Sequence, residues 1–200
     1  MHIATRPWTI LVMLIGCGSP DATPVVQQPG NEPRAAPSIA DASTPVPMVS
    51  GEKLPAELQA MLDEHNRLRA QHCAEPLAWS DTVAHAAKAW VDHLAARGCG
   101  LQHSETSYGE NIAGGSASTQ SPVQVVNLWY RERDAYDFAR GGFSMRSGHF
   151  TQVVWRGSRR LGCASASCGD MRLWVCNYDP PGNMQGDFQR NVLPTSCASR

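Results

Sequence analysis

The architecture is set by Gly148-His149-Phe150-Thr151-Gln152-Val153-Val154-Trp155, a segment rich in β-branched and aromatic residues. Such residues are enriched in strands, so the segment predicts a strand that begins at His149. Two stretches of similar character follow, Leu161–Ala164 and Met171–Tyr178, and the turn-forming residues 165–170 separate them. Closely spaced strands of this kind predict an antiparallel sheet.

The sequence upstream of this segment is helical in pattern. Pro55 opens a stretch in which apolar residues recur every three or four positions, as on one face of a helix. Ser80 is placed to cap a second helix that ends at Gly98, and Ser121-Pro122 opens a third. Helices followed by strands predict an α+β fold.

Length and charge narrow the function. The chain has 200 residues, 42% of them hydrophobic, which is enough for one domain with a real core plus a tail. The formal net charge is −1, so the basic field that nucleic-acid binding requires is missing from the composition. No Gly-rich phosphate-binding motif is present in the sequence. We therefore expect no nucleic-acid partner.

The N-terminus reads as an export signal. The apolar run Trp8–Ile15 is too short to cross a bilayer. It ends in Leu14-Ile15-Gly16-Cys17, which resembles a bacterial lipoprotein signal, so residues 1–16 are expected to be removed and Cys17 to carry a membrane-anchoring lipid. Gly18 favours the outer membrane in such lipoproteins. The alternative is an ordinary signal peptide, an incidental cysteine and a secreted protein.

Residues 17–53 form the lipidated cysteine and a tether. The tether holds seven of the chain's 14 prolines and no aromatic residue, so it is expected to be disordered. The folded domain is expected over residues 54–197.

Six further cysteines lie in this domain: Cys73, Cys99, Cys163, Cys168, Cys176 and Cys197. An even number behind an export signal predicts three disulfides, for which 15 pairings are possible. Metal binding by these thiols is the weaker interpretation, because no CxxC pair is present in the sequence.

Four polar residues abut segments that should be buried: His103, Glu110, Glu132 and His149. Buried imidazoles and carboxylates need partners, so we expect these four to partner one another.

Several stretches of the chain resemble the CAP superfamily of cysteine-rich secretory, antigen 5 and pathogenesis-related 1 proteins. The resemblance covers about residues 54–192 and implies an α-β-α sandwich with a three-stranded antiparallel sheet between helices. It is carried by His103-Ser104, Gly109-Glu110-Asn111-Ile112-Ala113, Gly148–Trp155, Cys176-Asn177-Tyr178-Asp179-Pro180-Pro181-Gly182-Asn183, and the opening residues His65-Asn66-Arg67-Leu68-Arg69, Pro76-Leu77 and Trp79.

The resemblance also implies a cleft built from the same four polar residues. His103 and His149 would hold a divalent cation, most often zinc in relatives, while Glu110 and Glu132 orient the imidazoles. Two imidazoles make a poor zinc cage, so binding is expected to be weak and completed by water. The alternative is a purely structural network.

The family pattern implies the disulfides Cys163–Cys176 and Cys99–Cys168, which leaves Cys73 to Cys197. A Cys73–Cys99 bridge is the competing pairing.

Three functions remain open. The first is a non-catalytic binding module outside the cytoplasm, whose cleft takes a small molecule, lipid or protein. The second is a metal-dependent hydrolase that uses Glu110 and Glu132, with Ser104 as a conceivable nucleophile. The third is a lipid or sterol carrier, for which the loop Asp137–Ser147 offers only Phe138 and Phe143 as an apolar slot.

Overall fold

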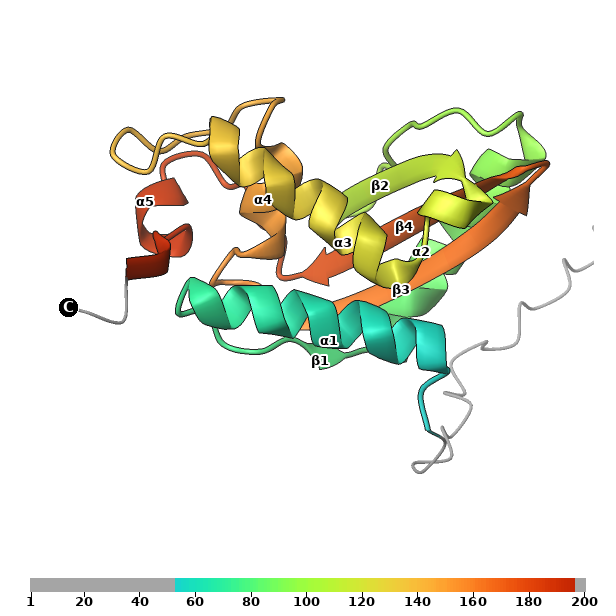
Figure 1. Ribbon diagram of the computed structural model, residues 1–200, viewed down its shortest axis with the longest axis horizontal. Helices are drawn as coiled ribbons and strands as arrows, with labels where there is room; N and C mark the ends of the chain where they lie inside the picture. Colours follow the sequence, from blue (N-terminus) through green and yellow to red (C-terminus); the bar gives the residue numbers. More distant parts are fainter. Residues whose placement is uncertain (1–52, 197–200) are drawn as a thin grey trace, which may run out of the picture. The chain divides into compact units, whose positions relative to one another are not determined.

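The computed structural model describes residues 53–196 (Figure 1). Its helices are α1 (Ala56–Gln71), α2 (Asp81–Ala96), α3 (Pro122–Arg131), α4 (Gly148–Val153) and α5 (Phe188–Asn191). Its strands are β1 (Ala78–Trp79), β2 (Gly109–Ser116), β3 (Arg160–Cys168) and β4 (Met171–Asp179).

The sheet has four strands in the order β1-β3-β4-β2, so the expectation of three strands was wrong. The β3–β4 hairpin and the β4–β2 pair are antiparallel. The fourth strand, β1, is two residues long and runs parallel to β3. Backbone bonds from Ala78 N to Arg159 O and from Ser80 N to Leu161 O, both 2.9 Å, flank it. So short a strand leaves no alternating pattern in the sequence.

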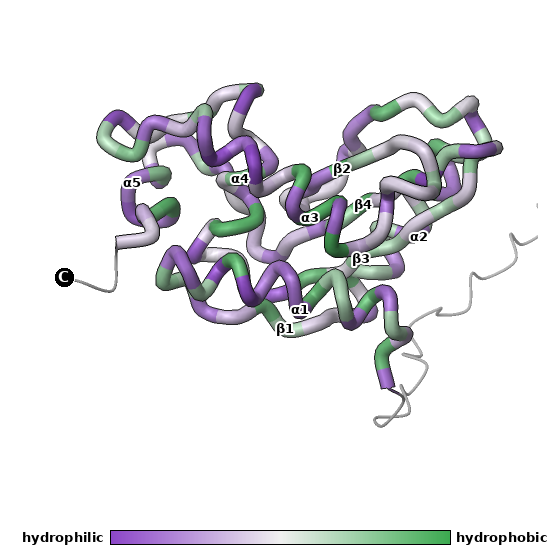
Figure 2. Tube along the Cα trace, in the orientation of Figure 1, coloured by the Kyte–Doolittle hydropathy of each residue, from purple (hydrophilic) through white to green (hydrophobic). Residues whose placement is uncertain are grey.

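Helices cover both faces of this sheet, which confirms the α+β class (Figure 1). Strand β4 makes the two faces visible: Trp174 and Tyr178 pack in one core cluster with residues of α1, α3 and α4. The alternate residues Leu173 and Val175 pack in a second cluster with α2. Helix α1 alternates between polar and apolar segments, as expected of a helix with one buried face (Figure 2).

The predicted helix starts are confirmed. The side chain of Ser80 accepts a hydrogen bond from Val83 N, and Ser121 forms a reciprocal capping box with Gln124. Gly162 is needed where α2 crosses β3, because a Cβ there would lie 2.0 Å from the backbone nitrogen of Ala84.

The strand expected from His149 to Trp155 was wrong, because its first residues form helix α4. Phe150 and Val153 are fully buried there. Both ends of the helix also find distant partners: Glu132 accepts the N–H groups of His149 and Phe150, and the Arg69 guanidinium donates to the carbonyl of Val153. Long-range packing and capping thus override the local strand propensity. Strand β2, not residues 149–155, pairs with β4 in the sheet.

Two of the expected disulfides are confirmed, Cys163–Cys176 across the hairpin and Cys99–Cys168. The competing Cys73–Cys99 pairing is therefore wrong. Cys73 is itself disulfide-bonded, and its expected partner Cys197 lies outside the described residues.

The signal segment 1–16, Cys17 and the tether up to residue 52 also lie outside the described residues. Within residues 53–196, no helix has the length and apolar character that crossing a membrane requires.

Candidate functional site

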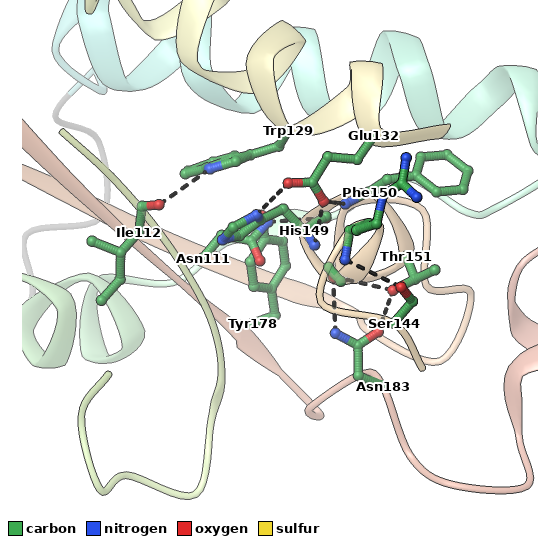
Figure 3. A network of polar contacts seen from close by, with 12 residues as sticks. Asn111, Ile112, Trp129, Glu132, Ser144, His149, Phe150, Thr151, Tyr178 and Asn183 are labelled. Atoms are coloured by element: carbon green, nitrogen blue, oxygen red, sulfur yellow. Dashed lines mark hydrogen bonds and ion pairs between the residues drawn. The ribbon is translucent and has the colours of Figure 1, made fainter. Parts of the chain in front are cut away.

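The first histidine–glutamate pair joins the ends of two helices. Glu132 follows the last residue of α3, and His149 lies in the first turn of α4. The imidazole Nδ1 of His149 donates to Glu132 Oε1 at 2.6 Å, while the backbone nitrogens of His149 and Phe150 donate to Oε2 at 2.9 and 3.3 Å. The ring of Trp129 stacks against His149, with 6.3 Å between centroids. One carboxylate therefore fixes both the imidazole and the start of the helix (Figure 3).

The second pair is built within one loop and the strand that follows it. His103 lies before β2 and Glu110 within it. Glu110 Oε1 accepts from His103 Nδ1 at 2.8 Å and from Ser104 N at 2.9 Å, and Oε2 accepts from the Ser104 hydroxyl at 2.6 Å. The Glu110 side chain is 5% exposed, whereas that of His103 is 65% exposed.

These contacts shift the acidity of three groups. The hydrogen bond to Glu110 raises the pKa of His103. Burial pushes the pKa of Glu110 upward, but hydrogen bonds from His103 and Ser104 outweigh burial and leave that pKa below its ordinary value. Glu132 follows the same pattern, because bonds from His149 and the α4 backbone outweigh its burial. Both glutamates are thus held as carboxylates.

Three of the four predicted residues line a single pocket of about 190 Å³: His103, Glu110 and His149. Glu132 is not among the lining residues and accepts the hydrogen bond from Nδ1, at the edge of the His149 ring. Each Nδ1 donates to its glutamate, so each neutral imidazole has its lone pair at Nε2. Within residues 53–196, neither Nε2 atom takes part in a hydrogen bond.

Sequence reasoning missed a buried chain of hydrogen bonds behind His149. The Asn111 amide nitrogen donates to the carbonyl of His149 at 3.1 Å and to the Tyr178 hydroxyl at 3.2 Å (Figure 3). Tyr178 in turn donates to His65 Nε2 at 2.8 Å, because His65 Nδ1 donates to Met61 O at 2.7 Å. Asn111 thus connects strand β2 to the backbone of α4. His65, on the apolar face of α1, was the available signal.

The pocket wall also contains Phe143 and Met145 from the loop before α4, and Asn183 from the loop after β4. Phe143 was considered in the sequence only as part of a sterol slot, and Met145 was missed. A methionine four residues before a site histidine was the available signal.

Several chemical roles can be judged from this geometry. The Ser104 hydroxyl is committed as a donor to Glu110, and every oxygen of both glutamates accepts at least one hydrogen bond. Within the part of the chain that the structure describes, no group of three His, Cys, Asp or Glu side chains is placed to hold a metal ion. Of the four predicted residues, only the imidazoles of His103 and His149 could therefore offer ligand atoms to a metal in this pocket, and other donors would have to complete its coordination.

Comparison with known proteins adds to this picture. Pathogenesis-related protein 1A of Nicotiana tabacum is 44% identical over 132 residues, which cover 64% of this chain and 78% of the relative. Secreted protein RBT4 of Candida albicans is 38% identical over 173 residues, 84% of this chain and 45% of the relative.

Solved structures agree on the fold. The crystal structure of Na-ASP-1 superposes with a TM-score of 0.59 at 22% identity and covers 74% of this chain and 44% of that one. The crystal structure of NaASP2 with Zn²⁺ gives a TM-score of 0.56 at 25% identity, with 75% and 92% covered. The family model described as CAP, the cysteine-rich secretory protein family, matches residues 62–178. This match covers more than half of the sequence, so the chain belongs to the cysteine-rich secretory protein (CAP) family.

Proposed function

We propose that this CAP domain is a non-catalytic binding module outside the cytoplasm, whose pocket between His103 and His149 weakly holds a divalent cation. The observation that carries the proposal is the matched arrangement of the two imidazoles. Each has its Nδ1 bound to a carboxylate, which fixes the tautomer and leaves Nε2 as a ligand atom beside the same pocket.

Zinc is the expected cation, because imidazole is a common zinc ligand and a related structure contains Zn²⁺. Known zinc sites use three or four protein ligands, and His103 with His149 supplies two. Water must therefore complete the coordination, which makes weak binding the expectation. Bound zinc would supply a Lewis acid, while the protein's own part is to hold the imidazoles.

The binding proposal is tested by titrating the full chain with Zn²⁺ in a calorimeter. Replacing His149 by Gln should weaken the Kd by about 100-fold or abolish binding, since one of two ligands is lost. The matched control is His93→Gln on α2, an exposed histidine that does not line the pocket, and it should bind within about twofold of wild type. Equal affinities in both variants would contradict a site at His149.

The hydrolase alternative gains no support from the geometry. Both carboxylates have lowered pKa values, and each of their oxygens already accepts a hydrogen bond, so neither is poised to accept a proton. The Ser104 hydroxyl donates to Glu110, not to an imidazole. A pocket of about 190 Å³ is also below the size of typical small-molecule sites, roughly 300–1,000 Å³.

A sterol slot in the 137–147 loop is weakened by the position of Phe138. That ring packs against His72, Tyr136 and Phe150 in the core, which leaves Phe143 as the loop's exposed aromatic residue.

An apolar ligand elsewhere is the second candidate function, because a different pocket has the required size. It measures about 590 Å³, and its lining includes Leu58, Trp79 and Trp174. We propose it as the site for a lipid chain, if the domain carries one. Solvent extraction of the purified protein followed by mass spectrometry should then recover about one lipid per chain, and repeated empty preparations would contradict carriage.

Placement outside the cytoplasm is supported by the two described disulfides and by the printed name of the relative RBT4, a secreted protein. Anchoring through a lipid on Cys17, in the outer membrane, is part of the same proposal. Intact-mass analysis from the native host should show residues 1–16 removed and Cys17 carrying acyl mass. An unmodified Cys17 would reduce the proposal to a secreted protein.

A further inference from the structure

The donors that surround the pocket are unequally available. The four glutamate oxygens all accept hydrogen bonds, and Asn183 is committed through Oδ1 to Thr151 at 2.6 Å and through Nδ2 to Gly148 O at 2.9 Å. The amide nitrogen of Asn111 is likewise in use. As nitrogen and sulfur donors of the lining, this leaves the two imidazole Nε2 atoms and the thioether of Met145.

The backbone holds Met145 at the pocket while its side chain stays free to turn. It lies in a turn closed by the bond from Ser147 N to Ser144 O, 3.0 Å, and by the bond from Arg146 N to the Ser144 hydroxyl, 3.2 Å. The residue is 84% exposed, so no packing is lost when the thioether moves. Methionine has three rotatable side-chain bonds and adapts readily to a partner.

The pocket lining also has an apolar part, formed by Phe143 of the same loop. Phe143 lines the pocket, and its ring packs so closely on α4 that a Cβ at Gly148 would lie 3.0 Å from Cε2. A side chain at position 148 would therefore require the Phe143 ring to move by a few tenths of an ångström. Phe143 and Met145 together give the pocket a sulfur donor and an apolar side that an oxygen-rich cation site lacks.

Two imidazoles and a thioether are a soft donor set with few ligands. Thioethers select copper(I), and imidazole binds both copper and zinc. Zinc prefers at least three nitrogen, sulfur or carboxylate ligands, whereas copper(I) accepts low coordination numbers. Because each Nδ1 is bonded to a glutamate, Nε2 is the ring nitrogen that each imidazole directs to a ligand in the pocket.

We propose that this pocket binds copper(I) more tightly than zinc, with His103 Nε2, His149 Nε2 and the Met145 sulfur as ligands. The proposal rests on the proposed function, since it uses the same histidine pair. It adds a ligand from this chain's own loop and a choice of metal.

The test is an anaerobic competition for copper(I) between the full chain and the chromophoric chelator bicinchoninate, with a parallel Zn²⁺ titration. Every variant carries Cys17→Ser, because a free thiol would itself bind copper(I). Met145→Leu keeps the size and apolar character of the side chain and removes the sulfur. Met184→Leu is the matched control, because Met184 is 51% exposed and does not line the pocket.

Met145→Leu should weaken the Kd for copper(I) by about tenfold or more and leave that for Zn²⁺ within about twofold. Met184→Leu should match the parent for both metals. X-ray absorption at the copper edge should show a sulfur ligand in the parent that is lost in Met145→Leu. Unchanged copper(I) affinity in Met145→Leu, or tighter binding of Zn²⁺ than of copper(I), would overturn the copper proposal. If Zn²⁺ binding still depends on His149, the proposed function survives that result; a parent chain that binds neither metal overturns both.

Discussion

His149–Glu132 and His103–Glu110 are built on the same bond, from an imidazole Nδ1 to a carboxylate that also accepts a backbone N–H. The two pairs differ in the parts of the structure that hold them in place. The His149 pair joins α3 to α4, and its imidazole is 34% exposed. The His103 pair spans seven positions of one loop and strand, and its imidazole is 65% exposed. One ligand is thus fixed by the core and the other by local structure.

The buried chain through Asn111, Tyr178 and His65 reinforces this difference. It ends on the carbonyl of His149 and connects α4 to α1 through the sheet. We therefore expect damage to the core to disturb the His149 side of the pocket first.

Lowering the pH should produce the largest effect on stability, because it protonates His65 at the buried end of the hydrogen-bonded chain. Burial lowers the pKa of His65 to about 4 from an ordinary 6.5, so between these values the unfolded chain binds more protons than the folded one. The free energy of unfolding must then fall as the pH falls through this window, by roughly 3 kcal/mol. Urea unfolding measured at several pH values checks this.

Two histidine replacements test this assignment, one at His65 and a control at His93. His65→Gln should flatten the pH dependence across that window, and His93→Gln, an exposed position on α2, should leave it as in wild type. Identical slopes in wild type and His65→Gln would contradict a neutral, buried His65.

Replacing Glu132 by Ala should have the next largest effect. It removes the imidazole partner and the one oxygen, Oε2, that accepts both N–H groups at the N-terminus of α4, so a loss of about 2–3 kcal/mol in the free energy of unfolding is expected. Glu110→Ala should cost only about 1 kcal/mol, because Ser104 and the exposed His103 are released toward water. Urea unfolding compares them, and equal losses would remove the distinction between the pairs.

Tyr178→Phe should have a smaller effect of about 1–2 kcal/mol, because the ring still fills the core while His65 and Asn111 each lose a partner. The imidazole resonances of His149 should shift in NMR spectra, and those of His103 should stay in place. A larger shift at His103 would reverse the assignment of which pair the core supports.

His103→Gln should have the smallest effect on stability, within about 0.5 kcal/mol of wild type, because the imidazole is mostly exposed. The same variant should nevertheless weaken Zn²⁺ binding by about tenfold or more, as measured by calorimetry. A large loss of stability would place this histidine in the structural framework.

Prediction from the sequence succeeded where the signals were local. Ser80 and Ser121 cap their helices in the structure, and the apolar repeat of α1 faces the core. It failed at α4, where Phe150 and Val153 have strand propensity but are buried in a helix held by Glu132 and Arg69. These partners lie 18 and 84 positions away, beyond the reach of any local pattern.

For the candidate site, the four polar residues could be named from motif resemblance, but their division of labour could not. Whether a glutamate lines the pocket or supports a ring from outside it depends on how α3 meets α4. The presence of Met145 in the pocket lining likewise depends on the turn closed by the bond from Ser147 N to Ser144 O.

Caps, apolar periodicity and signature motifs were sufficient for the class of fold, the helix starts and the identity of the histidines and glutamates, because each is encoded by residues a few positions apart. The conformation of residues 148–153, the fourth strand and the contrast between the two imidazoles emerged from packing. Their free energies come from contacts between residues far apart in the chain, and a linear sequence does not display those contacts.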